Sequence, residues 1–186
     1  MAGKIVLVTG GARSGKSTFA ERYVAALNTS VAYIATAEVL DEEMVRRVSL
    51  HQERRPAEWC TFEAPYDAEV VLKEVGQNTG AVLFDCLTLY ISNFLLTGEN
   101  LSPGERLRTM KQKIASLVES AKTVSATVVF VTNEVGLGIV PDNVLAREFR
   151  DCAGIANQMV AAAADEVYLV VCGLATEIKK NALVFR

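Results

Sequence analysis

The stretch Gly10-Gly11-Ala12-Arg13-Ser14-Gly15-Lys16-Ser17 matches the phosphate-loop pattern G-x-x-x-x-G-K-[ST] at every fixed position. Residues 4–9 before it form an apolar, β-branched run of the length of a buried strand. Residues 18–27 after it have helical spacing and contain good helix formers. The motif therefore has the strand-loop-helix context that it requires, and we predict a nucleotide site here.

Each position of this loop has a physical role. Glycines at 10, 11 and 15 allow backbone angles that a Cβ would penalise, so successive N–H groups can turn toward phosphate oxygens at the start of a helix. We expect Lys16 to reach the β- and γ-phosphates and the Ser17 hydroxyl to hold Mg²⁺. Glycine-rich turns also occur without ligands, but the full pattern favours the nucleotide site.

Length and composition predict one folded domain spanning residues 1–186. Hydrophobic residues make up 51% of the chain and charged residues 22%, as in ordinary globular proteins. A net charge of −3 does not favour nucleic acid or an anionic membrane as a partner. We find neither a signal-peptide pattern nor an apolar run near the ~20 residues of a membrane span, so we expect a cytoplasmic protein.

The cysteines and the histidine do not predict a zinc site. Cys60, Cys86, Cys152 and Cys172 are far apart, and His51 is the one histidine of the chain. Neither a C-x-x-C pair nor another zinc-ligand spacing is therefore present. We expect the cysteines to be reduced and mostly buried.

Apolar strand-like runs alternate with helical patterns along the whole chain. This order predicts an α/β protein: a three-layer fold like that of P-loop NTPases, with a mainly parallel central sheet and ligands at the carboxyl ends of its strands. Besides the first strand and helix, we predict strands at 30–36, 59–63, 80–85, 126–132, 166–172 and, at an edge, 182–185, helices at 41–55, 67–75, 87–96, 105–121 and 143–164, and a loop at 98–104.

Asp85 ends the apolar run 80–85, as the acid of a Walker B strand does. A carboxylate there is a natural partner of Ser17 around Mg²⁺, either directly or through water. The alternative is that Asp85 caps the helix expected to begin at Leu87, because such turns often carry caps.

His51 lies in an arginine-rich segment. On a helix, residues three and four positions apart share a face, so Arg47, Arg54 and Arg55 would surround the imidazole. Nearby cations keep the ring neutral and nucleophilic, while guanidinium groups can bind a triphosphate. The alternatives are a solvated basic helix face and a histidine with a structural role.

Five segments in this order carry a resemblance to one family, the bifunctional adenosylcobinamide kinase / adenosylcobinamide-phosphate guanylyltransferases of cobalamin biosynthesis. They are residues 8–17, 33–37, His51 with 55–59, 131–141 and 162–167. The resemblance implies that the protein phosphorylates the aminopropanol hydroxyl of adenosylcobinamide with ATP or GTP. It also implies GMP transfer from GTP to that phosphate through a guanylyl-histidine, which gives adenosylcobinamide-GDP and pyrophosphate.

The resemblance also assigns site residues. It makes His51 the nucleophile, with Lys16 neutralising the leaving pyrophosphate, and it implies a homotrimer. The family often has glutamate at the position of Asp85, which is one methylene shorter. The implied nucleotide contacts are Gly10, Gly11, Ala12, Arg13, Ser14, Gly15, Lys16, Ser17, Ala35, Thr36, Ala37, Gln52, Glu53, Arg54, Arg55, Glu63 and Asp85, of which Ser17 and Asp85 hold the metal.

Two other functions use the same parts. A kinase of another small metabolite could use the arginine-rich segment 46–55 as a lid. A GTP- or ATP-operated switch or motor is a second alternative, although the guanine signature N-K-x-D is missing. If both activities of the family share one phosphate loop, the nucleotide must present its γ-phosphorus in one step and its α-phosphorus to His51 in the other. We therefore expect the His51 helix to move.

Overall fold

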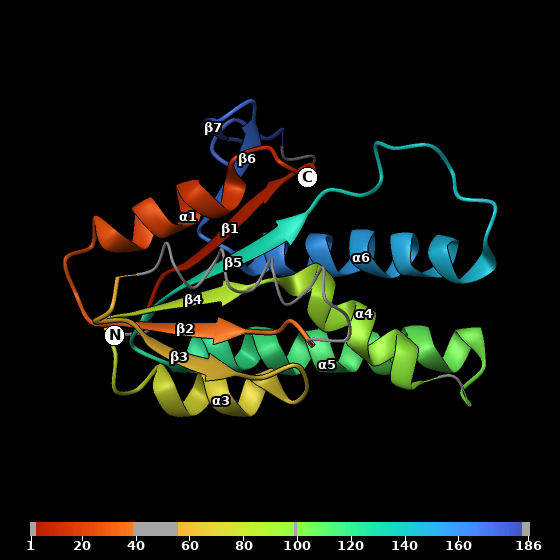
Figure 1. The fold of residues 1–186 in the computed structure, drawn as a ribbon, viewed down its shortest axis with the longest axis horizontal. Coiled ribbons are helices and arrows are strands. Elements are labelled where there is room, and N and C mark those ends of the chain that lie inside the picture. The colour runs from red at the N-terminus through yellow and green to blue at the C-terminus, as the bar shows by residue number, and fades with distance from the viewer. Residues whose placement is uncertain (1–2, 39–55, 99, 184–186) are drawn as a thin grey trace.

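The computed structural model describes residues 3–38, 56–98 and 100–183, and within them a seven-stranded sheet forms the centre of the molecule (Figure 1). The strand order is β3-β2-β4-β5-β1-β6-β7. The first six strands in sequence pair in parallel, and β7 is antiparallel to β6. The strands are β1 (Ile5–Gly10), β2 (Val31–Ala35), β3 (Cys60–Glu63), β4 (Ala81–Asp85), β5 (Thr127–Asn133), β6 (Glu166–Val171) and β7 (Leu174–Glu177).

Helices cover both faces of this sheet, which confirms the predicted three-layer α/β fold. Side chains alternate along each strand, so Leu7 and Phe84 belong to one apolar core while Val8 and Leu83 belong to the other. The first core packs against α3 (Ala68–Val75), α4 (Leu87–Thr97), α5 (Pro103–Thr123) and α6 (Val144–Ala163). The second core packs against α1 (Lys16–Ala25), and we call this side of the sheet the α1 face.

Helix α5 begins two residues earlier than predicted, within the segment expected to be a loop. Ser102 is its N-cap, and the Ser102 side chain and the Glu105 backbone form one half of a capping box. The Glu105 carboxylate accepts the Ser102 N–H at 3.0 Å and forms the other half. Pro103 is tolerated at the first helical position because its missing N–H would have no partner there.

Two other predictions were wrong. Ala182 and Leu183 are not in a strand, and residues 184–186 lie outside the described part. The antiparallel edge strand is instead β7, which follows β6 after a turn at positive-φ Cys172 and Gly173. Cys172 is exposed, and so is Cys60 on the edge strand β3, so the cysteines are not mostly buried.

The predicted helix 41–55 lies outside the described residues. Among the helices that the structure describes, none combines the length and the apolar character needed to cross a membrane.

A two-point ion pair joins α5 to α6. Arg106 donates from Nε and Nη2 to the two carboxylate oxygens of Glu148, both at 2.7 Å. Both side chains are only 13% exposed. A third donor of the guanidinium, Nη1, reaches the carbonyl of Leu101 at 2.6 Å, before the start of α5. Arg106 therefore fixes both the N-terminal end of α5 and its contact with α6.

We expect Arg106→Ala to lower the free energy of unfolding by about 2–4 kcal/mol, because it leaves the Glu148 carboxylate largely buried without this partner. Urea unfolding with an unchanged m-value would measure the loss. Lys122→Ala is the matched control, since Lys122 pairs with Glu119 on the exposed surface of the same helix and should change stability by less than about 0.5 kcal/mol. Equal effects of the two substitutions would contradict this reading.

Candidate active site

The phosphate loop connects β1 to α1 at the carboxyl edge of the sheet. Its backbone includes two left-handed residues, Arg13 with φ 58° and Gly15 with φ 94°. The Ser14 N–H donates to the Gly11 carbonyl at 3.2 Å, which closes the turn inside the loop. Gly15 is the N-cap of α1 and has no side-chain capping bond, so the positive end of this helix faces the loop.

Neighbouring strands hold the loop from both sides. On the β5 side, the Glu134 N–H donates to the Gly10 carbonyl at 3.0 Å. On the β6 side, the Gly173 N–H donates to the Ser14 carbonyl at 2.8 Å. Gly173 could not be predicted as part of the site, because this contact joins residues about 160 positions apart in the chain. Its only local signal is a glycine that follows a predicted strand.

Lys16 lies in the loop as a phosphate-binding lysine should. Its Nζ donates to the Gly11 carbonyl at 3.2 Å, and the residue is only 9% exposed. Burial lowers the pKa of the Lys16 ammonium, while the negative charge of Asp85 acts in the opposite direction. Asp85 is therefore close enough to act electrostatically on Lys16, although its strand is not adjacent to β1.

Two buried hydroxyl groups, one in the loop and one on the strand before it, have no hydrogen-bond partner in the described residues. They are Ser14 Oγ and Thr9 Oγ1. Buried hydroxyls normally have a partner. A phosphate oxygen at the loop would supply one to Ser14, so this observation agrees with the predicted anion site.

Three predicted nucleotide contacts form one row across the sheet. Ala35 on β2 is in register with Asp85 on one side and with Glu63 on the other. Residues in register on parallel strands point to the same face, which here is the α1 face because Ala35 packs against that core. Asp85 and Glu63 are two strands apart, roughly 10 Å. The same spacing separates the strand of Asp85 from the phosphate-loop strand.

Asp85 is held by a tyrosine that the sequence did not single out. The Tyr33 hydroxyl donates to Asp85 Oδ2 at 2.6 Å. Tyr33 is 2% exposed. In the sequence it is one residue of an apolar strand, and nothing there indicates that its hydroxyl contacts Asp85. The N-cap of α4 is Cys86, without a side-chain capping bond. The alternative in which Asp85 caps this helix is therefore wrong.

Thr36 joins β2 to β4 at this edge. Its Oγ1 donates to the Cys86 carbonyl at 2.7 Å and accepts the Cys86 N–H at 2.8 Å. Its own N–H donates to the Asp85 carbonyl, and its carbonyl accepts from Asn93 Nδ2. All polar groups of Thr36 are thus engaged within the protein. We expect a nucleotide to touch Thr36, if at all, through van der Waals contact.

Asn133 is a further polar residue at this edge of the sheet, and it was not among the predicted site residues. It ends β5, in register with Gly10, between the phosphate-loop strand and the strand of Asp85. Its Nδ2 donates to Thr88 Oγ1, and its carbonyl accepts from Asn157 Nδ2, each at 3.2 Å. The signal that could have found it is a polar residue directly after a buried strand.

The catalytic residue expected from the resemblance, His51, lies outside the described residues, as do Gln52, Glu53, Arg54 and Arg55. Within the described ranges, no three His, Cys, Asp or Glu side chains come together as a metal cage. The prediction that Ser17 and Asp85 hold Mg²⁺ does not need such a cage, because this ion typically takes one or two protein oxygens and completes its shell with phosphates and water.

Comparisons with known proteins give a consistent result. A family model described as "Cobinamide kinase / cobinamide phosphate guanyltransferase" matches residues 6–178. The proteins of Salmonella typhimurium and Escherichia coli named "Bifunctional adenosylcobalamin biosynthesis protein CobU" are each 44% identical to the chain over 182 residues, covering 94% of the chain and 99% of the relative. The Pseudomonas aeruginosa protein named "Bifunctional adenosylcobalamin biosynthesis protein CobP" is 39% identical to the chain over 178 residues. This match covers 95% of the chain and 98% of the relative.

We expect Gly15→Ala to lower the free energy of unfolding by about 1–2 kcal/mol, because an L side chain is strained at positive φ. The new Cβ would also lie 3.1 Å from Gly173 Cα, which would push the loop from its support and weaken GTP binding. Urea unfolding and calorimetric GTP titration measure the two effects. Gly104→Ala is the control, since nothing lies within 4 Å of its Cβ position. Unchanged GTP affinity in Gly15→Ala would contradict the role given to this turn.

Proposed function

The chain belongs to the cobinamide kinase / cobinamide phosphate guanyltransferase family, and we propose that it phosphorylates adenosylcobinamide and then transfers GMP from GTP to the product. The observation that carries this proposal is a complete phosphate loop within a match that spans nearly the whole of the bifunctional relatives. The family assignment decides against a kinase of another small metabolite and against a switch or motor. We place both activities in the cytoplasm.

In the kinase step, the phosphate loop binds the donor, ATP or GTP. The inward N–H groups of the loop and the Lys16 ammonium balance the charge of the β- and γ-phosphates. The aminopropanol hydroxyl of the acceptor attacks the γ-phosphorus, the bond to the β-phosphate oxygen breaks, and the hydroxyl proton is lost to a base. Because Lys16 is buried, each of its charge contacts is stronger than it would be in water.

We assign Mg²⁺ to Ser17 and Asp85. When bound, the ion supplies positive charge at the phosphates. Tyr33 orients the Asp85 carboxylate through its 2.6 Å hydrogen bond, and an oriented carboxylate loses less conformational freedom on binding an ion. Aspartate here, in place of a longer glutamate, suits either direct contact or contact through one water.

In the transfer step, the imidazole of His51 attacks the α-phosphorus of GTP and pyrophosphate leaves. The phosphate of the acceptor then attacks the same phosphorus, and the phosphorus–nitrogen bond breaks to restore the free imidazole. Ala35 ends β2 and Glu63 ends the outer strand β3, in register with each other, and Thr36 and Ala37 follow β2 directly. This row supports a nucleotide lying across the edge, with its phosphates at the loop.

We expect GTP labelled at the α-phosphate to leave an acid-labile label on the His51 peptide, because a phosphoramidate survives denaturation but not acid. His51→Ala should carry no label while its GTP affinity stays within about twofold, since the phosphates bind at the loop. Peptide mapping after denaturation is the measurement. GTP labelled at the γ-phosphate is the control and should leave nothing on this peptide. If the wild-type protein binds GTP but its His51 peptide carries no label from the α-phosphate, the proposed guanylyl-histidine intermediate is contradicted.

We further propose a homo-oligomer, with a trimer as the expected state. The loop after β5 and the start of α6 expose five large apolar side chains, and Leu137 and Ile139 are 89% and 96% exposed. Apolar side chains gathered on one surface are typical of a protein interface. The small residues Ala153 and Ala156 of α6 are instead buried in this chain's own core. The five residues are Leu137, Ile139, Val140, Val144 and Leu145.

Ile139→Asp should shift the protein from trimer to monomer, because a carboxylate would lose its hydration on entering an apolar interface. Light scattering coupled to gel filtration, over a tenfold range of protein concentration, measures the mass. Val70→Asp places the same charge at an exposed apolar site on α3 and should leave the mass unchanged. A wild-type monomer, or a trimer that survives Ile139→Asp, would contradict the assignment.

A further inference from the structure

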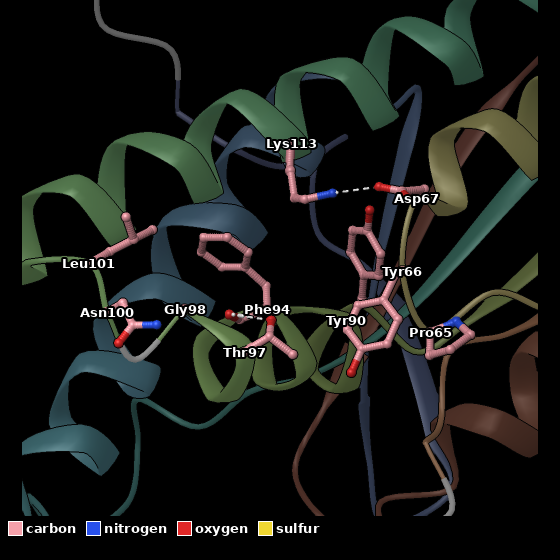
Figure 2. Close-up of a pocket in the computed structure, with 10 residues that line it drawn as sticks. All are labelled: Pro65, Tyr66, Asp67, Tyr90, Phe94, Thr97, Gly98, Asn100, Leu101 and Lys113. Atoms are coloured by element: carbon pink, nitrogen blue, oxygen red, sulfur yellow. Dashed lines mark hydrogen bonds and ion pairs between the residues drawn. The ribbon is translucent and has the colours of Figure 1, made fainter.

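A pocket of about 390 Å³ lies between the β3–α3 turn, α4, the segment before α5 and Lys113 in the middle of α5 (Figure 2). Three aromatic rings, those of Tyr66, Tyr90 and Phe94, gather around it in Figure 2, and Lys113 lies above them on α5. Its volume is in the range of small-molecule sites. The row of Ala35, Asp85 and Glu63 lies on the α1 face of the sheet, so this pocket is separate from that row.

The charged groups of this pocket already have partners. Lys113 Nζ lies 2.9 Å from Asp67 Oδ1 and 3.9 Å from Glu69 Oε1, and the first pair is drawn in Figure 2. The Tyr90 hydroxyl donates to the Glu69 carboxylate at 2.6 Å. One ammonium with two carboxylates offers no excess positive charge to a phosphate. The pocket therefore suits a neutral ligand surface that is mainly apolar.

Hydrogen bonds link the pocket to the carboxyl edge of the sheet, where the predicted nucleotide contacts lie. Asn93 Nδ2 on α4 donates to both the Thr36 carbonyl at 2.8 Å and the Pro65 carbonyl at 3.1 Å. Pro65 lines the pocket, and Thr36 follows the strand that carries the predicted nucleotide contacts. The Tyr66 hydroxyl donates to Glu38 at 2.6 Å. Strand β2 lies three strand spacings from the phosphate-loop strand, about 14 Å.

We propose that this pocket binds the apolar rim of the corrin ring of the acceptor, an inference that rests on the proposed function. The corrin rim carries methyl groups and uncharged amides, which fit an aromatic wall with a charge-balanced border. A pocket of this volume holds one edge of such a ring and leaves the rest outside. The reacting hydroxyl is on a flexible arm of the ring, so the ring can sit well away from the phosphates.

Thr97→Trp tests this assignment by filling the pocket from the last turn of α4. Leu96→Trp is the matched control: it places the same ring one residue away, at an exposed position that does not line the pocket. We expect Thr97→Trp to raise the KM for adenosylcobinamide in the kinase step by roughly tenfold, the size expected for losing the contacts of one ring. The dissociation constant for GTP should not change in either variant.

A second variant guards against an unforeseen effect of the added ring. Tyr66→Ala removes one aromatic wall at an exposed position and should also raise the KM for adenosylcobinamide, with GTP binding unchanged. Unchanged KM values for the corrinoid in both variants would overturn the assignment and leave the proposed function intact. Weaker GTP binding in both variants would overturn it by making the pocket part of the nucleotide site. A wild-type protein that phosphorylates no corrinoid would overturn the proposed function and this inference together.

Discussion

The parallel pairing of six strands is the constraint on which the rest of the structure depends. It brings their carboxyl ends to one edge, where main-chain groups extend beyond the last ladder bonds. At the centre of this edge, the turn after β1 is supported by N–H donors from its two neighbours, Glu134 beyond β5 and Gly173 beyond β6. The phosphate loop is therefore rigid on both flanks before any ligand arrives, which reduces the ordering cost of binding.

Local charge, and not net charge, supports the predicted anion site of this acidic protein. The chain carries a net charge of −3, yet the loop brings one buried lysine together with the N-terminal end of a helix. The α3–α4–α5 side of the same edge is different, since its lysine is paired with two carboxylates. One edge of the sheet thus presents two chemically distinct surfaces, one suited to phosphates and one to neutral apolar groups.

Most strands could be predicted because a parallel strand buried on both faces is a continuous apolar run, visible without any partner. The predictions for β1, β4 and β5 agree with the structure to within one or two residues. Residues 174–177 are the counterexample. The strand β7 has four residues, and its one large apolar side chain, Leu174, is exposed, so its pairing with β6 has no apolar signature. The prediction that Cys60 is buried was wrong for a related reason. It used only the residue type, whereas the exposure of Cys60 follows from the position of β3 at the edge of the sheet.

By itself the sequence determined the phosphate loop, the alternation of strands and helices and the acid at the end of β4, because each of these is a local pattern of residue types. Only the tertiary structure decided which strands are neighbours. It placed Asp85 and Glu63 in one row on either side of Ala35, brought Tyr33 to Asp85 and set Gly173 against the loop. The physical reason is that strand pairing joins residues distant in sequence, and local propensity contains no information about the partner or the register.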